Sequence, residues 1–145
     1  MIQHHRLEHR FVKHIPEVLD PGVLYVSMEY ATSAHSCCCG CGSEVVTPIT
    51  PTDWKITFDG ETVSLFPSIG NWALECRSHY FIGHGTVIEA APWVDEHVEA
   101  AHRRDRTAKA RYYGKLIKPS VQRVPEIENQ GRIRKAWNRL TERFK

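Results

Sequence analysis

Five cysteines give this 145-residue sequence its most distinctive chemistry. Four of them lie within one short run, which contains Cys37, Cys38, Cys39 and Cys41. The fifth, Cys76, precedes His79 by three residues. Thiolates and imidazoles bind zinc in tetrahedral sites, typically as two short-spaced pairs donated by two separate loops. The sequence therefore predicts that the chain folds around one bound metal ion, and that this ion is zinc.

The choice of ligands within the cysteine run is open between two spacings. Cys38 and Cys41 have the C-x-x-C-G spacing of a zinc knuckle, whereas Cys39 and Cys41 form a tighter C-x-C pair, and Cys37 is spare in both. We select as ligands Cys39, Cys41, Cys76 and His79. In the alternative set, Cys37 or Cys38 replaces one of them. Four protein ligands close a zinc site, so we expect a structural ion rather than a catalytic one.

The context of the cysteines favours bound metal over disulfides. Their number is odd, and the first 20 residues carry His, Arg and Glu rather than an apolar signal core. No run of about 18 apolar residues, the length that a membrane-crossing helix needs, is present. We therefore expect a cytosolic protein that has no membrane partner and whose thiols stay reduced.

The elements that must position these residues are mostly β-strands. The predicted strands cover residues 23–29, 54–58, 61–65, 79–82 and 86–89. The second and third alternate apolar and polar residues around Asp59-Gly60, which is a strong hairpin signal. The last two flank Gly83-His84-Gly85, which predicts a second hairpin with a glycine loop. We expect a mainly antiparallel β domain over residues 1–94, with zinc-ribbon-like hairpins.

The sequence changes character after residue 94. Residues 95–113 are rich in Ala, Glu, Arg and Lys, as in a helix. A second C-terminal helix is predicted from one apolar stripe, formed by Ile133, Trp137, Leu140 and Phe144. Residues 102–145 hold 14 Lys/Arg against 4 Asp/Glu, a net +10, and residues 1–101 hold 5 against 13, a net −8. We expect an α+β fold in which residues 95–145 form a basic helical extension that packs on the acidic domain. A docking surface for a protein partner is the alternative, and nucleic acid is not expected.

The stretch from Phe11 to Ala90 resembles the bacterial family known as domain of unknown function 6527. The segments that carry the resemblance are FVKHIPEVLDPGVLYVSMEY, a His before C-x-C-G-C-G, VVTPITPTDWKITFDGETVSLFPSIGNW and CRSHYFI. The family pattern has a residue other than cysteine at the position of Cys38, which favours the pair Cys39 and Cys41 as ligands. Members occur beside genes for bacterial ubiquitin-like conjugation. The resemblance thus implies a serine peptidase that processes or removes a ubiquitin-like protein, with that protein, its conjugates and conjugating enzymes as partners.

A serine peptidase needs a nucleophile, a base and donors for the oxyanion. Ser68 lies in a predicted turn, Pro67-Ser68-Ile69-Gly70-Asn71, where the Gly70 amide or the Asn71 side chain could face the oxyanion. His35 is our candidate base, with Glu29 as a possible orienting carboxylate. In the alternative interpretation, Ser68 caps a structural turn and His35 supports or joins the metal ligands. The rival nucleophiles are Ser64, Ser78 and Cys37.

Two other functions are compatible with the same residues. A zinc-dependent hydrolase would use an ion with an open coordination position to activate water, which four ligands disfavour. A non-enzymatic, zinc-ribbon-like adaptor would bind a ubiquitin-like protein or its conjugating enzyme and would need no nucleophile.

Overall fold

The computed structural model of this protein describes residues 1–116. Within this part of the chain, eight strands precede one helix. Their bounds are β1 (Glu8–Phe11), β2 (Val23–Ser27), β3 (Thr32–Ser36), β4 (Glu44–Pro48), β5 (Lys55–Phe58), β6 (Val63–Gly70), β7 (His79–Gly83), β8 (Thr86–Glu89) and α1 (Asp95–Leu116).

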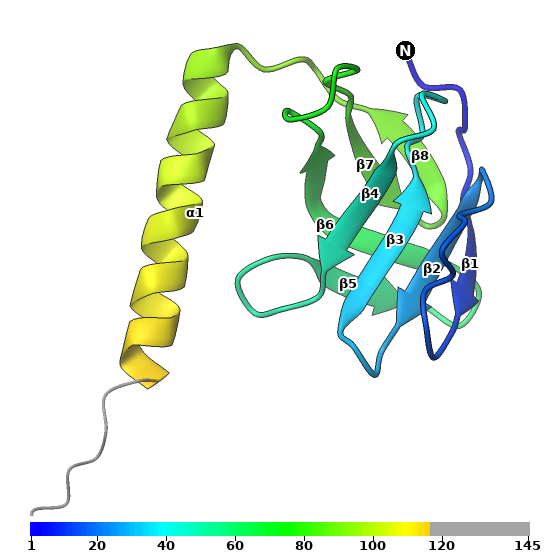
Figure 1. The fold of residues 1–145 in the computed structure, drawn as a ribbon, viewed down its shortest axis with the longest axis horizontal. Coiled ribbons are helices and arrows are strands. Elements are labelled where there is room, and N and C mark those ends of the chain that lie inside the picture. The colour runs from blue at the N-terminus through cyan, green and yellow to red at the C-terminus, as the bar shows by residue number, and fades with distance from the viewer. Residues whose placement is uncertain (117–145) are drawn as a thin grey trace, which may run out of the picture. The chain divides into compact units, whose positions relative to one another are not determined.

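The strands form two four-stranded sheets, in the orders β1-β2-β3-β4 and β5-β6-β7-β8 (Figure 1). All neighbouring strands are antiparallel except β1 and β2, which are parallel. The N-terminal segment joins the sheets. The Leu7 amide donates to the Gly85 carbonyl at 2.8 Å, and the Val87 amide donates to the His5 carbonyl at 2.8 Å, before the chain continues into β1.

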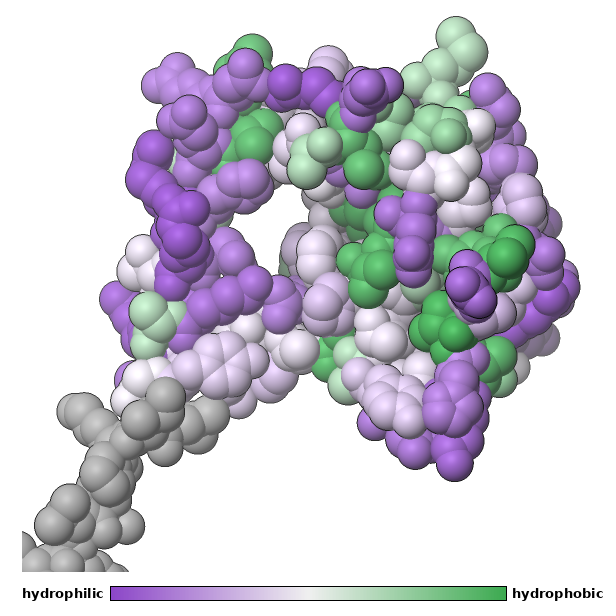
Figure 2. All heavy atoms as spheres, in the orientation of Figure 1, coloured by the Kyte–Doolittle hydropathy of each residue, from purple (hydrophilic) through white to green (hydrophobic). Residues whose placement is uncertain are grey.

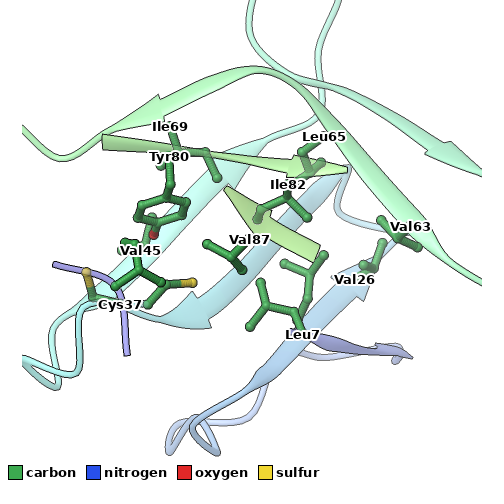
Figure 3. Packing of buried hydrophobic residues seen from close by; sticks show 13 residues of the cluster. Leu7, Val26, Cys37, Val45, Val63, Leu65, Ile69, Tyr80, Ile82 and Val87 are labelled. Carbon is green, nitrogen blue, oxygen red and sulfur yellow. The ribbon is translucent and has the colours of Figure 1, made fainter. Parts of the chain in front are cut away.

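Side chains from both sheets form the core (Figure 3). The strand β7 shows the alternation that produces it: Tyr80 and Ile82 are buried in the core, whereas Phe81, between them, is 44% exposed. Leu24 and Val26 on β2 contribute from the other sheet. Because side chains of a strand alternate between its faces, the residues of β7 flanking Tyr80 face away from the core.

Both predicted hairpins are confirmed. β5 and β6 pair across Asp59-Gly60, where the Asp59 carboxylate accepts hydrogen bonds from the amides of Glu61 and Thr62 at 2.9 and 2.6 Å. β7 and β8 pair across the glycine loop. The expected strand at 23–29 ends earlier, at Ser27.

The mainly antiparallel β domain and the first C-terminal helix are also confirmed. The second predicted helix, with Ile133, Trp137, Leu140 and Phe144, lies outside the described residues. The division into domains at residue 94 stays a prediction. Although α1 is 22 residues long, its sequence is too polar to cross a membrane, and the described residues contain no other helix.

Candidate active site and metal centre

Ser68 lies in an irregular part of β6. The cross-strand pairs with β7 shift from Leu65 opposite Ile82 to Ile69 opposite Tyr80, so three residues of β6 face the single residue Phe81. Bulges of this kind interrupt the ladder and re-aim side chains. The expected turn at Ser68 is therefore a bulged strand, and the Ser68 side chain is half-buried on the outer face of the sheet.

His79 is the imidazole that contacts Ser68. The Oγ atom of Ser68 lies 2.9 Å from Nε2 of His79. On the other side of the ring, Nδ1 lies 2.8 Å from the carbonyl oxygen of Ala91. A carbonyl oxygen only accepts hydrogen bonds, so in the neutral ring Nδ1 carries the proton and Nε2 has a free lone pair. The Ser68 hydroxyl therefore donates to Nε2, which is the arrangement that activates a serine nucleophile.

Two tryptophans hold the His79 ring in place. Trp72 and Trp93 stack with centroids 5.6 Å apart and an interplanar angle of 16°. His79 contacts both, at centroid distances of 5.0 and 5.2 Å. The indole of Trp72 also lies directly over Gly70, where an added Cβ would sit 2.4 Å from its Nε1. Only glycine at position 70 leaves room for this arrangement.

Ser68 and His79 open into a pocket of about 360 Å³. Its walls are formed by Thr52, Asp53, Trp54, Pro67, Ser68, Gly70, Trp72, His79, Trp93, Ala101, His102, Asp105 and Lys109. The last four belong to α1, and Lys109 lies 2.6 Å from Asp53. Burial works against ionisation of Asp53, but its hydrogen bonds with Lys109 and Thr50 outweigh this effect and lower its pKa.

His35, the base expected from the sequence, lies away from Ser68. It is fully buried on β3, where its Nε2 lies 2.8 Å from the Tyr80 hydroxyl. Burial disfavours the charged imidazole and lowers the pKa of His35 to about 4. Glu29 pairs with Lys13 at the surface, 3.9 Å apart, and does not orient His35. The structure thus brings Ser68 together with His79 and not with His35, because the central position of β3 places His35 in the interior.

Four cysteine sulfurs lie within 4.8 Å of one another, and they belong to Cys37, Cys39, Cys41 and Cys76. Sγ of Cys37 lies 3.4 Å from that of Cys39 and 3.9 Å from that of Cys76. A tetrahedral zinc ion with bonds of about 2.3 Å holds its sulfurs about 3.8 Å apart, so this cluster fits zinc. Three of the selected ligands meet here, and Cys37 occupies the place expected for His79, whose two ring nitrogens bond Ser68 and Ala91.

Neutral donors surround the cluster. The Ser78 hydroxyl lies 3.2 Å from Sγ of Cys37, and Nδ2 of Asn71 donates to that hydroxyl at 2.8 Å. Hydrogen bonds from Ser43 lower the pKa of Cys41 to about 6, which favours the thiolate that zinc binds. Because the Asn71 amide is used in this interior network, it does not face Ser68 as an oxyanion donor.

The remaining candidates have other surroundings. Cys38 is buried in the core, and burial raises the pKa of its thiol to about 12. Ser64 accepts a hydrogen bond from the backbone amide of His84 at 2.9 Å. Ser78 and Cys37 contact each other in the network beside the cluster. In the described part of the chain, Ser68 is the only one of the four candidate nucleophiles with a hydrogen bond to an imidazole.

Sequence reasoning did not select His79 as the partner of Ser68. The available signal was the predicted strand that begins at His79, since an antiparallel neighbour of β6 would place this residue opposite Gly70, as observed. Ala91 and Trp93 gave no signal, because they act through a backbone carbonyl and through ring packing.

Comparison with known proteins adds one match. Residues 11–90 match the family described as bacterial ubiquitination-like system serine protease (BubE). The family has a different name from the one that the sequence resemblance gave, but the association with a bacterial ubiquitin-like pathway is the same. No curated protein and no solved structure matches the chain.

Proposed function

Because the chain belongs to the bacterial ubiquitination-like system serine protease (BubE) family, we propose that it cleaves a ubiquitin-like protein from a precursor or conjugate, with Ser68 as nucleophile and His79 as base. The observation that carries this proposal is the 2.9 Å contact between Oγ of Ser68 and Nε2 of His79. The direction of this hydrogen bond is set by Ala91, whose carbonyl oxygen accepts a hydrogen bond from Nδ1–H, the only ring N–H of neutral His79.

In the first step, Ser68 Oγ attacks the carbonyl carbon of the scissile bond and its proton passes to Nε2 of His79. The resulting imidazolium then gives this proton to the leaving group, and an ester between Ser68 and the substrate remains. Water attacks the ester with His79 again as base, which releases the acid and restores the serine. The Ala91 carbonyl holds the ring in one orientation throughout.

The four-cysteine cluster is proposed to bind one structural zinc ion. Such an ion would cross-link the loop between β3 and β4 to Cys76, three residues before His79 in the chain. Four thiolates leave no position for a reactive water, so this set argues against the zinc-dependent hydrolase. Ser78 and Asn71, which contact the cluster, adjoin His79 and Gly70 in sequence, and the Asn71 amide bonds the Ser78 carbonyl at 2.9 Å. The cluster therefore supports the strands that carry the catalytic pair.

The proposal is tested by active-site labelling. The purified protein is incubated with a fluorophosphonate, and the modified peptide is identified by mass spectrometry. We expect the label on Ser68 and its loss in Ser68→Ala and His79→Gln, while Ser64→Ala serves as the matched control. Labelling of another serine, or none, contradicts Ser68 as nucleophile. Cleavage of a precursor of a ubiquitin-like protein then tests the substrate class, and tight binding without cleavage would favour the adaptor.

A further inference from the structure

The helix α1 is attached to the β domain at few points. Val98 is buried, whereas most of the other side chains of α1 are exposed. At the start of the helix, Asp95 pairs with Arg77, which precedes β7. Fourteen residues later, Lys109 pairs with Asp53 of the loop between β4 and β5 at 2.6 Å. The pair Asp95–Arg77 is exposed and the pair Lys109–Asp53 is partly buried. Ion pairs at or near the surface stabilise contacts only modestly, so α1 is fixed less firmly than a helix with an apolar face.

Between these attachments, α1 forms one wall of the pocket that contains Ser68. Ala101, His102, Asp105 and Lys109 line the pocket from the helix. The facing walls come from the β domain and include the three tryptophans. Figure 2 shows the hollow between α1 and the β domain. Since the family match ends at residue 90, it does not account for this wall.

We propose that α1 restricts Ser68 to extended polypeptide segments and that the ion pair between Lys109 and Asp53, which holds this wall closed, determines the specificity. This inference rests on the proposed function of Ser68. The substrate reaches Ser68 as a flexible tail that passes between α1 and the outer face of β6 and β7. A compact folded loop is excluded while the ion pair is closed.

The size and chemistry of the pocket support an extended occupant. A volume of about 360 Å³ holds a few residues of polypeptide and not a folded domain. Trp54, Trp72 and Trp93 give it a largely apolar lining, whereas the wall from α1 is polar. An extended chain can pack small or apolar side chains on the tryptophans and leave its backbone polar groups toward the helix.

The test compares two fluorophosphonates that differ in bulk, a small diethyl compound and one carrying rhodamine. With either, Ser68 Oγ forms a bond to phosphorus, fluoride leaves and the hydroxyl proton passes to His79. We expect Lys109→Glu, which repels Asp53 and Asp105, to raise the rate ratio of bulky to small probe about two- to fivefold, the factor that loss of one weak, partly buried ion pair gives. Lys109→Arg keeps the pair and should keep the ratio.

The matched control is Arg103→Ala, because Arg103 pairs only with Glu99 of the same helix, at 3.7 Å, among the described residues. An unchanged ratio in Lys109→Glu, or an equal rise in Arg103→Ala, overturns the proposal.

A second measurement does not require reaction at Ser68. In a Trp137→Phe background, the remaining tryptophans are Trp54, Trp72 and Trp93, all of which line the pocket. We expect acrylamide to quench their fluorescence more strongly in Lys109→Glu than in Lys109→Arg. If neither probe labels Ser68, the proposed function fails, and the quenching measurement alone tests the role of α1. Equal quenching in Lys109→Glu and Lys109→Arg overturns the proposal that the ion pair holds α1 against the pocket.

Discussion

The carbonyl oxygen of Ala91 lies 2.8 Å from Nδ1 of His79, in the place that a carboxylate occupies in a Ser-His-Asp triad. A neutral carbonyl fixes the tautomer and the ring orientation as a carboxylate does, but it stabilises the imidazolium less. The stacked rings of Trp72 and Trp93 supply the remaining support for the ring. The proposed catalytic geometry is thus built from one strand pair and the segment after β8.

Replacement of His79 distinguishes the role of general base, proposed from the structure, from the role of zinc ligand, expected from the sequence. We expect His79→Gln to lower the rate of precursor cleavage by about 10²–10⁴-fold, the contribution of a general base, because glutamine cannot take the Ser68 proton. The bound zinc should stay at one ion per chain, since the sulfur cluster does not include His79. Cleavage kinetics and metal analysis of the same preparation check both expectations. Loss of zinc together with activity would instead support His79 as a ligand.

The double variant Ser68→Ala/His79→Gln tests whether the two residues act as a unit. Groups that act in one step are strongly non-additive, so the double variant should be no slower than Ser68→Ala alone. A further loss equal to that of His79→Gln would mean that His79 contributes independently of Ser68.

Gly70→Ala should impair catalysis without unfolding the protein. The added Cβ would lie 2.4 Å from Nε1 of Trp72, so the indole must move, and with it the support of His79. Misplacement of a catalytic group by about 1 Å can cost 10²-fold, and we expect a loss of about 10–100-fold in cleavage rate. Gly83→Ala is the matched control, because nothing lies within 4 Å of its added Cβ. Equal rates in the two variants would show that the position of Trp72 does not matter.

The fold could be predicted from local sequence signals, because the hairpins depend on them. Asp59-Gly60 and the glycine loop fix two turns, and the alternation of their flanking residues fixes which side chains are buried. The arrangement of the strands in two sheets joined by the N-terminal segment could not be predicted, because the pairing of residues 5–7 with residues 85–87 joins segments that are distant in sequence. No short-range sequence pattern predicts such long-range pairing.

The same distinction applies to the site. Cysteine spacing alone identified most of the cluster, because metal ligands must be donated from short-spaced pairs. It could not decide between Cys37 and His79, since this choice depends on the register of β7, which directs His79 to the outer face. His35 was selected for its place in the sequence near the cysteines, whereas its burial depends on β2 and β4 on either side of it.

The hairpin that leads into β6 should lose stability in acid. Hydrogen bonds from the Thr62 hydroxyl and from the amides of Thr62 and Glu61 hold the pKa of Asp59 well below its ordinary value. A carboxyl whose pKa is lower in the folded state contributes its full stabilisation above its unfolded pKa of about 3.9, and this contribution is lost progressively as the pH falls from that value to the lower folded pKa. Melting temperatures between about pH 5 and pH 2 should fall less steeply in Asp59→Asn than in the parent. Glu61→Gln removes the same charge from the same turn and should keep the steep dependence, and an equally shallow profile in both variants would contradict the role of Asp59.

Removal of the metal should unfold or loosen the protein rather than only inactivate it. The four sulfurs converge from two loops, and thiolates held this close repel one another without a cation between them. We therefore expect a strong chelator, or Cys76→Ser, to abolish stoichiometric zinc binding and to lower the unfolding free energy by several kcal/mol, since metal binding is coupled to folding.

Cys38→Ala is the control, because Cys38 lies in the core outside the cluster. This variant should retain one zinc per chain and lose only the small amount of stability that a small cavity costs. Metal analysis and denaturant titration of the two variants measure this difference. If Cys76→Ser retains one zinc ion per chain and an unchanged denaturant midpoint of unfolding, the cluster is not the metal site.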